Sequence, residues 1–239
     1  MDNFNSAQRL YEIISYLRGK SNTPGLQLGQ AYLEYFNDLG DPSDALIYAN
    51  QLAKLAKDVE NIIKSNEAIN DFQLAHLHPI FNFCRNLNLT VRLSIETSKI
   101  SDTSMLALQT YTHLFSTISN ESKVDDTVLS ALKDDIDELE NEINSGVENL
   151  ELKKVLLGII EAARYCLASY KIQGNKSFTL AFETMLGKII IEYEKNPTSQ
   201  NSSLKKIYNF IIKFGALAGA INETSSLSSN ISKSLGFSE

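Results

Sequence analysis

The sequence predicts an all-α protein, a multi-helix bundle of about eight helices with no significant sheet. Apolar residues recur at helical spacing over most of the 239 residues, and most glycines and prolines stand near the ends of those segments. Only one run alternates in the manner of a strand. With 43% hydrophobic and 21% charged residues, the chain has enough apolar material for a packed core.

Four helices are expected in the first part of the chain. The first follows Ser6, a suitable N-cap residue, and ends at Gly19. Thr23-Pro24 and Asp41-Pro42 should open the next two, because proline is tolerated in a first helical turn. The third should run to about Lys64 with a narrow seam formed by Ala45, Ala49, Leu52, Ala56, Val59 and Ile63. A fourth, over residues 68–86, should be kinked or split by Pro79.

The run LNLTVRLSI, residues 87–95, alternates apolar and polar residues as a half-buried strand does. No second run of this kind could pair with it, so we interpret it as an extended connector or as continued helix, and both remain open. It is also the expected boundary between two sub-bundles, 1–100 and 101–239, with a single domain as the alternative.

Helices are expected again at 103–119 and 125–145, followed by an αα-hairpin over 150–195. Gly174 stands between its two helices, where a left-handed residue would turn the chain back. The last expected helix, 203–221, should be packed rather than exposed, because it is apolar over most of its length. Its inward residues should be Ile207, Ile211, Phe214 and Ala218.

At the hairpin the sequence resembles a group of uncharacterised bacterial all-α proteins, in which a helix ends in a Tyr-x-Ile-x-Gly turn before a helix containing Leu-Ala. The matching residues are Tyr170, Ile172, Gly174, Leu180, Ala181 and Gly187, preceded by ELKKVLL. The resemblance implies an intracellular helical protein and supplies no activity, substrate or catalytic residue.

Composition and charge argue against several classes of function. A net charge of −7 disfavours general nucleic-acid binding, which needs a basic patch. Cys84 and Cys166 lie far apart without a CxxC spacing, and the first residues lack a charged and apolar leader. We therefore expect a cytoplasmic protein without a disulfide framework.

The segment from Glu121 to Glu142 is strongly acidic. It carries nine acidic side chains against two lysines, an excess of seven that equals the net charge of the whole chain. Asp134, Asp137 and Glu138 should lie on the exposed face of its helix and could bind a basic partner protein. The alternative is that these acids only keep the helix solvated.

No set of residues predicts catalysis, a cofactor or a metal site. His76 and His78 point about 200° apart on a helix, so one metal ion could not bind both. Cys166 lies in an apolar stripe, which makes Cys84, beside Arg85, the more reactive candidate. An enzyme with a scattered site would need a deep pocket that joins Cys84, Arg85, Arg92 and a histidine.

We therefore expect a non-enzymatic, helical interaction or regulatory accessory protein. A role in a bacterial system such as phage defence is suggested only by the resemblance. The alternative is a membrane-perturbing effector that acts through the apolar helix 203–221, which is shorter than the ~20 residues needed to span a bilayer. The partner's identity and self-association stay open.

Overall fold

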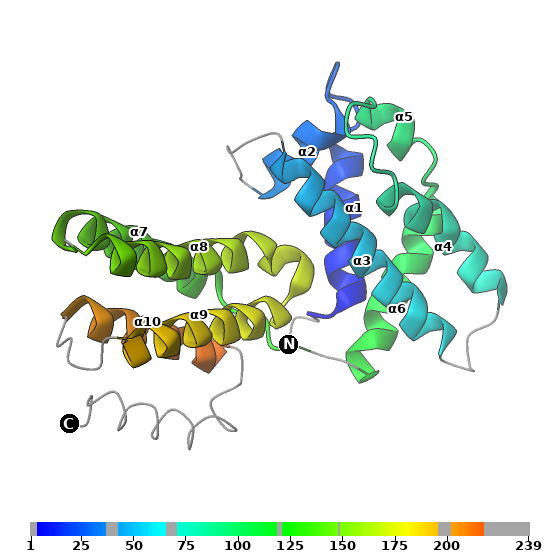
Figure 1. Ribbon diagram of the computed structural model, residues 1–239. Coiled ribbons are helices and arrows are strands. Elements are labelled where there is room, and N and C mark those ends of the chain that lie inside the picture. Colours follow the sequence, from blue (N-terminus) through cyan, green and yellow to red (C-terminus); the bar gives the residue numbers. More distant parts are fainter. Residues whose placement is uncertain are drawn as a thin grey trace. The chain divides into compact units, whose positions relative to one another are not determined.

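The protein is all-α, as predicted. The computed structural model describes residues 4–36, 43–65, 71–118, 121–147, 149–195 and 202–217, and these contain ten helices and no strand (Figure 1). The chain divides into two compact units, Met1–Lys123 with Lys171–Gly174, and Val124–Tyr170 with Asn175–Glu239. The expected boundary near residue 100 differs from this division, because the helix that follows residue 100 packs within the first unit.

The first unit is built around its N-terminal helix α1 (Ser6–Gly19). Helices α2 (Leu28–Phe36), α3 (Asp44–Lys64), α5 (Leu93–Thr97) and α6 (Asp102–Ile118) all pack against α1, and α4 (Asp71–Cys84) packs against α3 and α6. The apolar stripe of α1, whose residues recur at helical spacing, is fully buried: Leu10, Ile13, Ile14 and Leu17. Burial of each such side chain stabilises the unit by roughly 1.5–3 kcal/mol.

Two expected helix starts were wrong. The N-cap of α1 is Asn5 rather than Ser6, because the Asn5 side chain accepts a hydrogen bond from the backbone N–H of Gln8. Thr23-Pro24 lies in a turn, and α2 begins only at Leu28. The expected start of the third helix at Asp41-Pro42 lies outside the described residues, although the predicted seam of α3 is buried throughout.

The run 87–95 is part connector and part helix. Its first residues are not helical, and the carbonyls of Leu89 and Val91 accept hydrogen bonds from the N–H groups of Gly29 and Leu28. The connector thus supplies the partners that the first turn of α2 needs. Of its alternating apolar residues only Leu93 is buried, at the start of α5. Helix α4 continues through Pro79 and is not split.

The end of helix α8 (Leu150–Gln173) belongs to the first unit. There the buried Arg9 side chain donates from Nε to the Ile172 carbonyl at 3.0 Å and from Nη1 to Glu121 at 2.9 Å. The guanidinium lies beside Gly174, which has a φ of 62°. The left-handed conformation expected at Gly174 is confirmed, and the absence of a Cβ also leaves room for Arg9.

The second unit contains α7 (Asp126–Gly146), α9 (Lys176–Lys195), α10 (Ser202–Leu217) and most of α8. Helices α9 and α10 share an extensive contact, and α7 also packs against α10. Ile207, Ile211 and Phe214 of α10 are fully buried, which confirms three of the four expected inward positions. The fourth, Ala218, lies outside the described residues. Gly215 lies under the Phe182 ring, where a Cβ would come within 2.7 Å of the ring edge.

A nearly buried carboxylate in the first unit makes its stability depend on pH. Glu60 of α3 pairs with Lys64 at 2.8 Å and with Arg85. The hydrogen bond from Lys64 and the charge of Arg85 lower the pKa of Glu60, although burial opposes this shift. A lowered pKa means that the ionised side chain stabilises the fold above the pKa of the unfolded state, and that this contribution is lost as pH falls through the folded pKa.

We therefore expect Glu60→Gln to lower thermal stability at pH 7 and to approach the stability of the unchanged protein below about pH 4. Thermal denaturation of both proteins between pH 3 and pH 7 measures the difference. A matched control is Asp58→Asn on the exposed side of α3. A Glu60→Gln deficit that stays constant over this range would contradict the ion-pair account.

Candidate protein-interaction surfaces

The acidic helix α7 presents the three predicted partner-binding residues to solvent. Asp134, Asp137 and Glu138 are all exposed, as expected from their positions on the helix. Asp137, however, is not freely available, because its carboxylate lies 2.7 Å from the guanidinium of Arg164 on α8. Binding of a basic partner at this face stays a prediction, for which Asp134 and Glu138 are the better placed residues.

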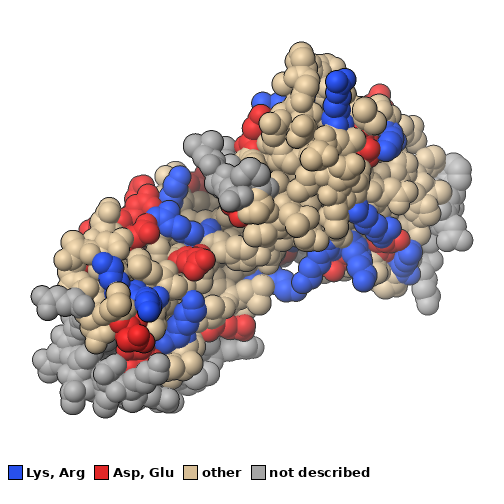
Figure 2. All heavy atoms as spheres, turned by 45° about the horizontal axis from the view of Figure 1, so that its top comes forward, with Lys and Arg blue, Asp and Glu red and all other residues tan. Residues whose placement is uncertain are grey.

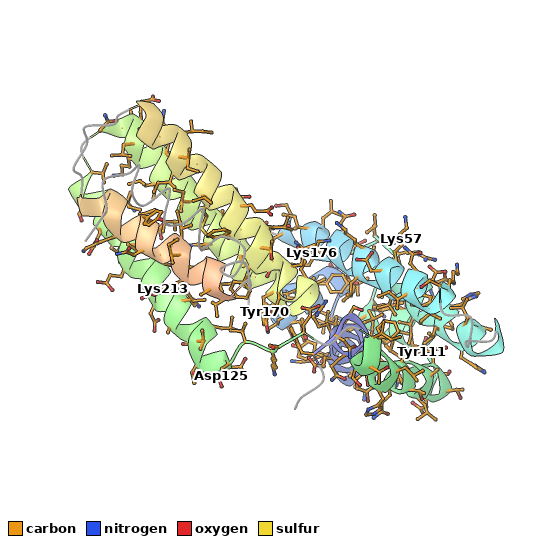
Figure 3. The ribbon with its side chains drawn as sticks, turned by 90° about the horizontal axis from the view of Figure 1, so that it is seen from below. Lys57, Tyr111, Asp125, Tyr170, Lys176 and Lys213 are labelled. Atoms are coloured by element: carbon orange, nitrogen blue, oxygen red, sulfur yellow. The ribbon has the colours of Figure 1, made fainter. Side chains whose placement is uncertain are left out.

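Several other acids of α7 pair with bases of neighbouring helices. Glu140 also binds Arg164, Glu142 binds Lys206, and Asp135 binds Lys213 of α10, which Figure 3 shows alongside α7. Figure 2 accordingly shows acidic and basic side chains interspersed on the visible surface of the second unit. Exposed pairs of this kind contribute ~0.2–1 kcal/mol each. Several of the acidic side chains that suggested a docking surface therefore form ion pairs between α7 and its neighbours α8 and α10.

A second surface lies on α6, and the sequence analysis missed it. We call it the α6 outer face, and it consists of Leu106, Thr110, His113, Leu114, Thr117 and Ile118, all of them exposed. Leu106 and Ile118 retain 64% and 56% of their accessible surface, and together with Leu114 they form a group of exposed large apolar side chains on one helix face. Helix α6 carries no Asp, Glu, Lys or Arg after Asp102.

The threonines make this face more apolar than their residue type suggests. The Thr110 hydroxyl donates to the Leu106 carbonyl at 3.0 Å, and the Thr117 hydroxyl donates to the Leu114 carbonyl at 2.7 Å. Because both hydroxyl groups are satisfied within the helix, the side chains present mainly their methyl groups outward. The opposite side of α6 is buried in the first unit and includes Leu108, Phe115 and Tyr111, the last of which is labelled in Figure 3.

The cysteines and histidines do not form the scattered active site that was considered. Cys84 is fully buried, and burial raises the pKa of its thiol well above the usual range, only partly offset by Arg85. The expectation that Cys84 is the more reactive cysteine was therefore wrong. Burial also raises the pKa of Cys166 to about 12. His76 and His78 lie on α4 and His113 lies on the α6 outer face. Within the described ranges, no group of three or more His, Cys, Asp or Glu side chains could hold a metal ion.

Comparison of the chain with protein-family models, with curated proteins and with solved structures found no match in any of the three. The resemblance noted at the hairpin gains no support from them. In the part of the chain that the structure describes, no helix is both long enough and apolar enough to cross a bilayer.

Proposed function

We propose that this protein is a helical interaction module that binds a partner protein through the α6 outer face. The observation that carries the proposal is the grouping of Leu106, Leu114 and Ile118, exposed at 64%, 44% and 56%, on a helix face without charged residues. Cores of protein interfaces are depleted in charge and rich in such side chains, whereas a solvated helix normally carries charge on its outer face.

The partner that this face fits is an uncharged, apolar helix or helical surface. A partner with charges at the contact would have to desolvate them against leucine, isoleucine and threonine methyl groups that offer no compensating hydrogen bond. Apolar side chains spaced along one helix are the anchors that helix-in-groove and helix-on-helix recognition uses. We do not extend the proposal to a bacterial defence system, because only the resemblance suggested that role.

The test is affinity capture from lysate of the native host with the Leu106→Lys, Leu114→Lys double variant. Two lysines within the contact should reduce the captured partner at least tenfold, a change of ~1.4 kcal/mol or more. The matched control is Leu180→Lys, Ile191→Lys on α9, which replaces two exposed apolar residues of another helix. Both variants should keep the thermal stability of the unchanged protein to within ~0.5 kcal/mol, since exposed positions tolerate charge.

A third variant, Asp134→Lys with Glu138→Lys, tests the acidic face of α7 independently of the α6 outer face. It leaves Asp137 and its pair with Arg164 intact. If this variant loses the partner while the α6 variant retains it, the acidic face of α7 is the binding surface and the proposal is wrong. Salt dependence of the captured amount should then also appear, because exposed charges are screened over ~8 Å at physiological ionic strength.

A further inference from the structure

The first unit contains a surface cavity of about 660 Å³ that is separate from the α6 outer face. It lies between α1 from Tyr11 onward, the turn that follows α1, the short helix α5 and the start of α6. Its volume falls within the range of ~300–1,000 Å³ that small-molecule sites occupy. The partly buried hydroxyl groups around it distinguish it from the other surfaces considered above.

Five polar side chains around this cavity are uncommitted. Within the described residues, the side chains of Tyr11, Ser15, Ser21, Asn22 and Ser94 have no hydrogen-bond partner in the protein. Serine within a helix commonly donates to a carbonyl of the preceding turn, as Ser145 of α7 does here to Asn141. Ser15, although it lies within α1, makes no such bond. Four hydroxyl groups and one amide therefore remain free to bind a ligand.

The cavity also has an apolar part and little net charge. Ile100 and Met105, both nearly buried, contribute the apolar surface. Arg18 is the one charged side chain among the lining residues, and its Nη2 donates to Asp102 at 2.8 Å. Helix α1 ends at the cavity, so its negative dipole end faces the same region. These features disfavour an anion and leave a neutral, hydroxyl-rich site.

We propose that this cavity binds a small neutral polyhydroxylated molecule of the size of a monosaccharide or disaccharide. The free hydroxyl groups and the Asn22 amide both donate and accept, which matches the hydroxyl groups of such a ligand. The paired Arg18 and Asp102 side chains place guanidinium N–H donors beside a carboxylate acceptor. Two adjacent hydroxyl groups of a ligand can therefore bind this pair, one by accepting from Arg18 and the other by donating to Asp102. Tyr11 and Met105 supply apolar surface for the C–H face of a sugar ring.

The probes are maltose, N-acetylglucosamine and myo-inositol, each titrated to 100 mM into the ¹⁵N-labelled full chain and followed by amide NMR shifts. Inorganic phosphate is titrated separately as the anionic alternative. We expect at least one of the three neutral probes to give saturable shifts around Ser15, Arg18 and Ser94 with a Kd of about 1 mM, typical of a small ligand without a charge contact.

Ser15→Leu and Ser94→Leu should each raise that Kd at least tenfold, because the added side chain fills the cavity and removes a hydroxyl. The matched control is Ser145→Leu, which replaces an exposed serine on α7. Thermal denaturation of each variant confirms that it is folded. Three results overturn the proposal: no saturable shift with any neutral probe, saturable shifts that survive both cavity variants, or saturation by phosphate alone.

Discussion

Replacing Gly174 with alanine is expected to lower the free energy of unfolding by ~2–5 kcal/mol, measured by chemical or thermal denaturation. Two costs add at this position. A left-handed conformation costs an L-residue ~1–2 kcal/mol, and overpacking costs ~1–3 kcal/mol. The second cost arises because a Cβ would lie 2.7 Å from Cζ of Arg9, a buried side chain held by Ile172 and Glu121.

Alanine substitutions at two other glycines distinguish the conformational cost from the packing cost. Gly25 has a φ of 74°, but a Cβ at this position would have no neighbouring atom within 4 Å, so Gly25→Ala should show only the conformational cost of ~1–2 kcal/mol. Gly187 lies within α9 and also has open space, so Gly187→Ala should stabilise the helix by ~0.5–1 kcal/mol. Equal losses at Gly174 and Gly25 would show that Arg9 adds nothing, and no loss at Gly174 would contradict the left-handed turn.

Replacing Phe214 with alanine is expected to destabilise the second unit by ~3–5 kcal/mol, because the ring is fully buried. Its centroid lies 5.0 Å from that of Phe210 and 5.6 Å from that of Phe178 on α9, so truncation removes contacts with both rings. Thermal denaturation measures the loss. Asn209→Ala, at an exposed position of the same helix, is the control and should change little.

The same variant distinguishes the packed helix from the membrane-perturbing alternative. If α10 acts by leaving the bundle to insert into a bilayer, Phe214 should matter for leakage of liposome contents rather than for stability. An unchanged melting temperature together with lost leakage would make the effector hypothesis the better account. A large drop in melting temperature is the result that the packed arrangement predicts.

The sequence predicted the helices well where an apolar stripe and a cap coincide. The seam of α3 and its end at Lys64 were confirmed because local apolar spacing determines them. The start of α8 has a local cap of the same kind, since the Asn149 side chain accepts a hydrogen bond from the Leu152 N–H. The start of α2 could not be predicted in the same way. Its first N–H groups bond to Leu89 and Val91, which are about sixty residues away, so no local pattern marks the start.

The interaction surfaces were harder to predict, because the charges of one helix do not show whether its side chains are available to a partner or already form ion pairs with neighbouring helices. The acids of α7 were interpreted as one exposed face, but the lysines and the arginine that pair with four of them come from α8 and α10. The α6 outer face did leave a signal in the sequence. The run TSMLALQTYTHLFSTI, residues 103–118, has no Asp, Glu, Lys or Arg, which is rare for a helix with a solvated side.

The central claim, that a partner protein binds the α6 outer face, is tested most directly by hydrogen–deuterium exchange of the full chain with and without the captured partner. Residues 106–118 should exchange more slowly in the complex, while α7 and the exposed side of α9 should exchange at the rates of the free protein. Protection confined to α7 would contradict the claim, and so would a complex in which α6 exchanges as fast as before.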